Sequence, residues 1–239
     1  MNQLIRFLWD AGLTQAVYNS FLALCFAGWF IYNFWSGKRY GLPGWKRITV
    51  SVVIWPLAYG LLYVLYWIES RFSQWGSHNI VRGFIYFPIL AVILGKLIHI
   101  RGRTIVDYIA PGVSLCQGIA HIGCSFAGCC HGYEASFGIW NPVRQTYMVP
   151  NQALEALAAL LTFAVCAIYA RRKQYNSDGR VYPLFLILFG VTRFFLEFLR
   201  DNEKVLGSVS ILALHAALMV IVGAAWLLVL RRTGRRNEE

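Results

Sequence analysis

Long apolar stretches recur along the whole chain and constrain its fold more than any other feature. Of the 239 residues, 58% are hydrophobic and only 14% are charged, whereas charged residues make up about 25% of an ordinary soluble domain. Each stretch is long enough to cross a hydrocarbon core of about 30 Å as a helix. The seven predicted spans cover residues 15–36, 48–68, 80–98, 105–130, 152–170, 181–200 and 208–230. The sequence therefore predicts an all-α polytopic membrane protein, a bundle of about seven transmembrane helices.

Basic residues are unevenly divided between the two sets of span ends. Fifteen of the 22 lysines and arginines follow the first, third, fifth and seventh spans. Because basic loops stay on the cytoplasmic side of a membrane, we expect the N-terminus outside and the C-terminus in the cytoplasm. This topology accounts for the net charge of +11, so we expect no nucleic-acid partner. Since the spans follow one another closely, residues 1–239 are predicted to form a single integral-membrane domain.

Charged and titratable residues of different spans fall at a common depth near the outer face. A helix rises about 1.5 Å per residue, and counting from the cytoplasmic ends gives heights of about 20–30 Å for this group. Its members are Arg82, His121, Glu155, Arg193, Glu197 and Arg200. Charged side chains inside a membrane must pair or face a watery cavity.

A cavity with three arginines suits a phosphate-bearing lipid headgroup, because guanidinium forks bind phosphate oxygens in pairs. Glu155 and Glu197 would then orient the guanidiniums. A purely structural ion pair between Arg193 and Glu197 is the alternative, and Arg82 could equally be an interfacial anchor.

Four of the six cysteines lie in the fourth predicted span, three of them in the segment His-Ile-Gly-Cys-Ser-Phe-Ala-Gly-Cys-Cys-His-Gly at residues 121–132. One interpretation is a metal site, although the spacing matches no common zinc pattern, so no metal ligand is assigned. Another is a disulfide, Cys124–Cys129 or Cys116–Cys124, on an oxidising outer side. A third is that the thiols only fill space. The simplest prediction for three cysteines in apolar runs is core packing: Cys25, Cys116 and Cys166.

Glycines are frequent in the same span, including Gly123 and Gly132. Small residues let membrane helices pack closely, and they also permit an irregular backbone beside a cavity. Pro111, Pro142 and Pro150 bracket the glycine-rich segment, and residues 131–151 follow the span. We expect these residues to form a short periplasmic loop that caps the cavity.

Motifs between residues 80 and 200 resemble those of the prolipoprotein diacylglyceryl transferase family. They are Asp107-Tyr-Ile-Ala-Pro111 with the 121–132 segment, Pro150-x-Gln152-x-x-Glu155, and Arg193-x-x-x-Glu197-x-x-Arg200. The usual family motif has an arginine where this chain has His121, and paralogues with Gly-Cys-x-x-Ala-Gly-Cys-Cys-x-Gly are grouped with the family. The resemblance implies a seven-span enzyme of the bacterial inner (plasma) membrane. Such enzymes move the diacylglyceryl group of phosphatidylglycerol to the thiol of a lipobox cysteine in a prolipoprotein.

Roles follow from the chemistry of each side chain together with this resemblance. His121 is predicted to be the general base for the acceptor thiol, because imidazole titrates near neutral pH. Arg193, aligned by Glu197, would stabilise charge on the departing glycerol phosphate. The substrate-binding candidates are Tyr18, Arg82, Gly123, Cys124, Gly132, Gln152, Glu155 and Arg200.

The expected partners are phosphatidylglycerol, a lipobox-containing prolipoprotein and membrane lipids, with no cofactor. Two other functions remain open for the same fold. One is a cysteine and histidine site for metal binding or thiol redox chemistry. The other is a non-catalytic, lipid-binding paralogue.

Overall fold

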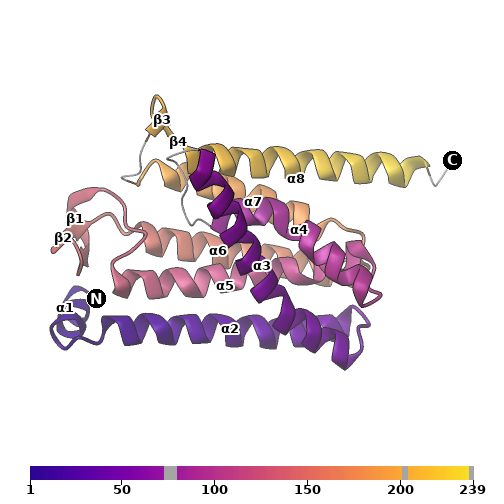
Figure 1. The fold of residues 1–239 in the computed structure, drawn as a ribbon, viewed down its shortest axis with the longest axis horizontal. Coiled ribbons are helices and arrows are strands. Elements are labelled where there is room, and N and C mark those ends of the chain that lie inside the picture. Colours follow the sequence, from indigo (N-terminus) through magenta and orange to yellow (C-terminus); the bar gives the residue numbers. More distant parts are fainter. Residues whose placement is uncertain (73–79, 201–203, 237–239) are drawn as a thin grey trace.

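The computed structural model of the chain describes residues 1–72, 80–200 and 204–236 and is built almost entirely of helices (Figure 1). The helices are α1 Asn2–Asp10, α2 Thr14–Arg39, α3 Gly44–Phe72, α4 Ile80–Leu97, α5 Gly102–Ala127, α6 Asn151–Arg172, α7 Val181–Glu197 and α8 Ile211–Arg236. Two antiparallel strand pairs complete the described part. They are β1 Glu134–Asn141 with β2 Thr146–Met148, and β3 Lys204–Leu206 with β4 Val209–Ser210.

The helices confirm the predicted all-α membrane fold. Five of those described are long and apolar enough to cross a membrane: Thr14–Arg39, Gly44–Ile68, Gly102–Ala127, Asn151–Arg172 and Ile211–Thr233. The other two predicted spans fall on α4 and α7, helices of 18 and 17 residues. The chain is therefore a multi-pass membrane protein, and seven crossings remain a prediction because α4 and α7 are short.

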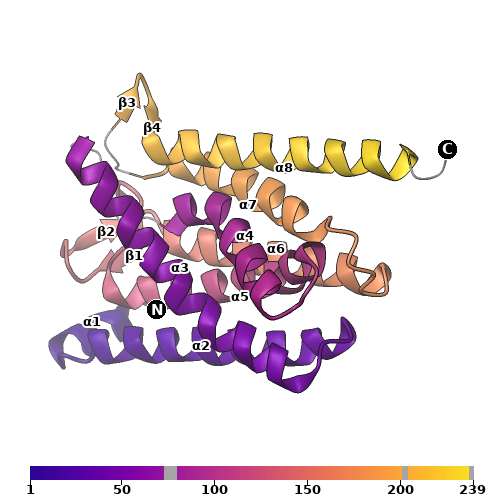
Figure 2. The ribbon, with the colours of Figure 1, turned by 45° about the vertical axis from the view of Figure 1, so that its right-hand side comes forward.

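The two termini lie at opposite ends of the bundle (Figures 1 and 2). The end that holds the N-terminus also holds α1 and both strand pairs, while the C-terminus of α8 marks the other end (Figure 2). Termini at opposite ends of the bundle agree with an odd number of membrane crossings. The prediction that the N-terminus lies outside stays a prediction. The predicted capping loop at 131–151 is largely the β1–β2 hairpin rather than irregular chain.

Helix α5 is the most deeply buried helix among the predicted spans and passes between α2 and α6 (Figure 1). Glycines make this close packing possible. A Cβ atom at Gly112 would lie 2.7 Å from the Asn33 amide of α2, and one at Gly118 would lie 2.7 Å from Leu160 of α6. Small residues thus bring helix backbones together without the need for large complementary side chains.

A disulfide between Cys25 of α2 and Cys116 of α5 joins the same pair of helices, with a Cα–Cα distance of 4.7 Å. The prediction that these two cysteines only pack in the core is therefore wrong. The alternative disulfide Cys116–Cys124 is wrong for the same reason. Adjacent helices bring residues 91 positions apart in sequence into contact, which sequence spacing cannot reveal. Cys166 is buried with a free thiol.

At its other end, α5 is fixed by Asp107. The two carboxylate oxygens accept hydrogen bonds from the backbone N–H groups of Gly179 at 2.7 Å and Val181 at 2.8 Å. A carboxylate that accepts backbone amides at a helix start satisfies donors that the helix itself leaves unpaired. Asp107 thereby holds the α6–α7 connection against the start of α5.

Candidate functional site

Glu155, in the second turn of α6, lies at the centre of a buried group of charged side chains. Its Oε1 atom accepts a hydrogen bond from Nη1 of Arg193. Arg200 binds the same carboxylate with two nitrogens, Nε to Oε1 at 3.1 Å and Nη2 to Oε2 at 2.8 Å. Only 4% of the Arg193 and Glu155 side chains and 10% of the Arg200 side chain are exposed. Two guanidiniums therefore share one carboxylate in a low-dielectric environment, where such contacts are strong.

Glu197 holds Arg193 from the opposite side. Nη2 of Arg193 lies 2.8 Å from Oε2 of Glu197, one helical turn further along α7. Ser210 donates its hydroxyl to Oε1 of Glu197 at 2.9 Å and accepts the backbone N–H of Ala213 at the start of α8. Two carboxylates thus balance the two guanidinium charges of Arg193 and Arg200.

His121 brings an imidazole to the same carboxylate. Its Nδ1 atom lies 3.1 Å from Oε2 of Glu155, and Asn151 donates its side-chain amide to Oε1 at 3.1 Å. Helices α5, α6 and α7 therefore each contribute a polar side chain to the group centred on the Glu155 carboxylate. Arg193 and His121, 72 positions apart in the chain, contact the same group.

Arg200 contacts Glu155 from a turn after α7, whereas the sequence predicted that it lies on the helix itself. The predicted span runs to residue 200 as one helix, but α7 ends at Glu197. The chain continues in a turn in which the backbone N–H of Arg200 donates to the carbonyl of Glu197 at 3.1 Å. The turn keeps Arg200 close to α7 and directs its side chain to Glu155.

Gln152 and the two glycines lie around the charged group. Gln152 is buried and donates its side-chain amide to the carbonyl of Cys129 at 2.9 Å, which ties α6 to the chain after α5. A Cβ atom at Gly123 would lie 2.7 Å from Phe21 and 3.4 Å from Tyr18, both on α2. Gln152 therefore lies where α6 meets the chain after α5, and Gly123 lies where α5 packs closely against α2.

Gly132 is a similar close contact, since a Cβ atom there would lie 2.6 Å from the carbonyl oxygen of Leu199. Arg82 lies in the first turn of α4, but its side chain falls outside the described part of the structure. Its predicted role stays a prediction.

Two members of the group were missed in the sequence. Asn151 is one helical turn before Glu155 on α6, so the spacing contained a usable signal. Ser210 contacts Glu197 only because the chain folds back after α7, and no local pattern indicates such a contact.

The cysteines after α5 form a second group beside His121. Gly128 ends the helix in the left-handed conformation, with φ of 73°, and Cys130 also has a positive φ of 58°. This turn brings the thiol of Cys130 within 4.8 Å of the thiol of Cys124. The thiols of Cys124, Cys129 and Cys130 are all free, so the suggested disulfide Cys124–Cys129 is not formed.

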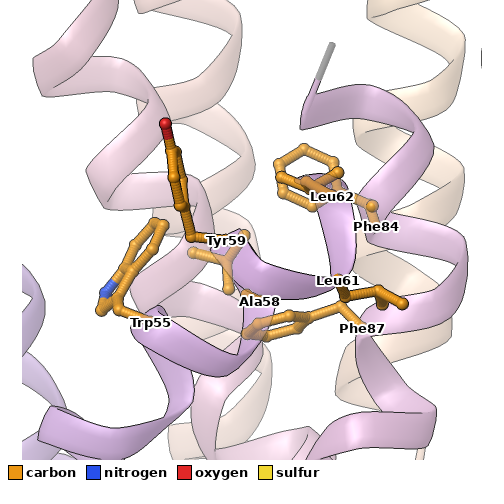
Figure 3. A pocket seen from close by; sticks show the side chains of 9 residues that line it. Trp55, Ala58, Tyr59, Leu61, Leu62, Phe84 and Phe87 are labelled. Carbon is orange, nitrogen blue, oxygen red and sulfur yellow. The ribbon is translucent and has the colours of Figure 1, made fainter. Parts of the chain in front are cut away.

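Apolar spaces lie elsewhere in the bundle. A cavity of about 50 Å³ between α3, α4 and α5 is lined by aromatic and aliphatic side chains, among them Trp55, Tyr59 and Phe87 (Figure 3). A larger groove of about 410 Å³ follows α6 and α7 and includes Leu154 and Thr192, the sequence neighbours of Glu155 and Arg193. The groove is therefore on the same two helices as Glu155 and Arg193, although neither of these side chains lines it.

The fold and this site define a polytopic membrane protein with arginine, glutamate and histidine side chains paired inside the bundle. Residues 57–229, most of the chain, match the model of the family described as prolipoprotein diacylglyceryl transferase. The protein belongs to that family and is a transferase by family resemblance.

Relatives with names of this kind are similar at modest identity. Phosphatidylglycerol–prolipoprotein diacylglyceryl transferase 2 of Clostridium perfringens is 27% identical over 175 residues, 70% of this chain and 68% of the relative. The transferase of Clostridium tetani is 32% identical over 115 residues, which is 45% of each chain. The transferase of Limosilactobacillus reuteri (strain DSM 20016) is 24% identical over 227 residues, 82% of this chain and 79% of the relative. The match therefore spans less than half of the C. tetani protein and more than three quarters of the L. reuteri protein.

Proposed function

We propose that the protein transfers the diacylglyceryl group of phosphatidylglycerol to the lipobox cysteine thiol of a prolipoprotein. We place this reaction at the inner (plasma) membrane of a bacterium, with membrane lipids around the bundle. Family membership supports the reaction class, and the names of the relatives support the two substrates. The observation that carries the proposal is the pair of buried arginines that share Glu155 with His121.

Binding of the donor falls to the two guanidiniums. Arg193 is held on both sides, by Glu155 and Glu197, so it is a fixed positive charge. Arg200 is the more exposed of the two, which supports its assignment to the phosphate of a lipid headgroup. Arginine suits this task because its planar fork binds two oxygens of one phosphate.

Transfer forms a bond from sulfur to the glyceryl carbon and breaks the bond from that carbon to the phosphate oxygen. The bonding electrons leave with glycerol phosphate, whose new negative charge appears beside Arg193 and Arg200. Positive groups that are already oriented stabilise such a charge without reorganisation, and removal of one comparable donor costs about 10²–10³ in rate.

The thiol proton goes to His121. Nδ1 of the imidazole lies 3.1 Å from Oε2 of Glu155, so we assign Nε2 as the proton acceptor, and the carboxylate would stabilise the imidazolium that forms. This use of a carboxylate to orient a histidine base recurs in unrelated enzymes.

The acyl chains of the donor need an apolar surface next to the headgroup. The groove along α6 and α7 has that character, and Leu154 and Thr192, the sequence neighbours of Glu155 and Arg193, line it. A lipid with its phosphate at Arg200 would lay its chains along Leu157, Leu161 and Phe195.

The test is transfer from labelled phosphatidylglycerol to a lipobox peptide by protein reconstituted in vesicles. Arg193→Ala is expected to lower the rate about 100-fold or more. Arg144→Ala is the matched control, because Arg144 is exposed in the β1–β2 turn and should retain the wild-type rate. Full activity of the Arg193 variant would end the assignment.

A separate measurement addresses the base. His121→Ala should lower the rate, because the acceptor thiol then lacks the side chain that takes its proton. An unchanged rate would remove His121 from the mechanism while leaving the arginines in place.

A further inference from the structure

Three side chains that can bind a soft metal ion meet at the end of α5. Ligand atoms of His121, Cys124 and Cys130 all lie within 4.8 Å of one another. Cys124 is buried, and the other two are partly buried. Zinc binds to thiolate sulfur at about 2.3 Å and to imidazole nitrogen at about 2.0 Å, so one ion between the three atoms would meet these lengths after small side-chain movements.

The backbone explains why these ligands meet although their spacing matches no common zinc motif. His121 and Cys124 are three residues apart in the last turns of α5 and therefore share a helical face. Gly128 in the left-handed conformation ends the helix, and the chain turns so that Cys130 faces Cys124. A turn, rather than a repeated two-residue gap, assembles the group.

The oxidation state of the cysteines agrees with a ligand role. The structure joins Cys25 to Cys116 and leaves Cys124, Cys129 and Cys130 as free thiols, with the sulfur atoms of Cys124 and Cys130 within 4.8 Å of each other. The thiolate of a free cysteine is the form that binds a metal ion. Zinc binding would satisfy Cys124 and Cys130 together.

The surroundings of His121 add an independent argument. Metal-binding histidines donate their second ring N–H to a carboxylate or carbonyl, which fixes the ring. Nδ1 of His121 lies 3.1 Å from Oε2 of Glu155, so a proton on Nδ1 would face this carboxylate and Nε2 would bind the metal.

We propose that His121, Cys124 and Cys130 form a Zn²⁺ site with one open coordination position. Three protein ligands and one exchangeable position are the arrangement of catalytic zinc sites, including those with two cysteines and one histidine. The remaining thiol, that of Cys129, is exposed and is not required as a ligand.

The open position suits an incoming thiol, because a thiol that coordinates zinc is deprotonated. This consequence rests on the transfer reaction proposed above, while the metal site itself does not. In the zinc-loaded protein, Nε2 of His121 is occupied by the ion, and the acceptor proton is released to solvent instead of to the imidazole.

Elemental analysis of the full chain, purified under reductant and equilibrated with zinc sulfate, tests the site. The expected content is one zinc per chain. His121→Ala, Cys124→Ser and Cys130→Ser should each lose the ion, and Glu155→Gln should weaken binding about 10–100-fold. Cys129→Ser is the matched control and should keep one zinc, because its thiol is exposed.

Cobalt gives a second readout that does not depend on activity. Co²⁺ in place of zinc should produce a sulfur-to-metal absorption band that disappears in the Cys124 and Cys130 variants. Circular dichroism of each variant checks that the helices are retained.

The site is overturned if the reduced wild-type protein binds no zinc, or if the three ligand variants bind it as tightly as Cys129→Ser. Transfer activity of the same samples separates the two proposals. Transfer without zinc binding refutes only the metal site, whereas zinc binding without transfer refutes only the proposed reaction.

Discussion

Replacement of Glu155 by glutamine tests the central feature of the site. The side chain keeps its shape but loses the negative charge that Arg193 and Arg200 share. In the variant, Glu197 is the remaining carboxylate of the group that contacts Arg193. The two guanidiniums of Arg193 and Arg200 then lose the carboxylate that both of them contact.

The size of the effect follows from this imbalance. Removal of one partner from a buried ion pair costs about 3–5 kcal/mol, because the other charge stays desolvated and unpaired. For a chain of this length, 1 kcal/mol corresponds to a shift of about 2–4 °C in the unfolding midpoint. We therefore expect Glu155→Gln to lower the midpoint by about 6–20 °C.

Thermal unfolding in detergent, followed by circular dichroism, measures the change. Glu134→Gln is the matched control, since Glu134 is exposed on β1 and accepts a hydrogen bond from Thr146 at 2.8 Å. Exposed polar pairs contribute about 0–1 kcal/mol, so its midpoint should stay near that of the wild type. If Glu155→Gln unfolds at the same temperature as this control, the two arginines do not depend on the shared carboxylate.

Three further substitutions test the frame around the site. Gly132→Ala would place a Cβ atom 2.6 Å from the backbone oxygen of Leu199, and thermal unfolding should show a loss of about 1–3 kcal/mol; an unchanged midpoint would contradict that packing. Ser210→Ala removes a hydrogen bond to the charged carboxylate of Glu197 and should cost about 1.5–3 kcal/mol by the same measurement, so wild-type stability would argue against the contact. Asp107→Asn weakens the hold on two backbone amides and should speed proteolysis of the α6–α7 connection. Asp107 lies about 20 Å along α5 from His121, so the transfer rate per folded molecule should not change. A lower transfer rate would show that the two ends of α5 are coupled.

Composition and hydropathy alone determined the membrane fold and the depth of its polar residues. A backbone in hydrocarbon must satisfy its own hydrogen bonds, so each apolar stretch has to be a helix. The fixed rise of a helix then converts sequence position into height. This is why His121, Glu155 and Arg193 could be assigned a common level before their contacts were known.

Tertiary structure alone decided which of these groups touch. The rotation of each helix about its axis places Glu155 between two guanidiniums and an imidazole, and depth contains no information about rotation. Breaks in the helices matter as well, because the turn at Gly128 gathers Cys124 and Cys130. Helix packing pairs Cys25 with Cys116 across 91 positions. Local sequence fixes the height of a side chain, whereas its partners depend on how whole helices pack against one another.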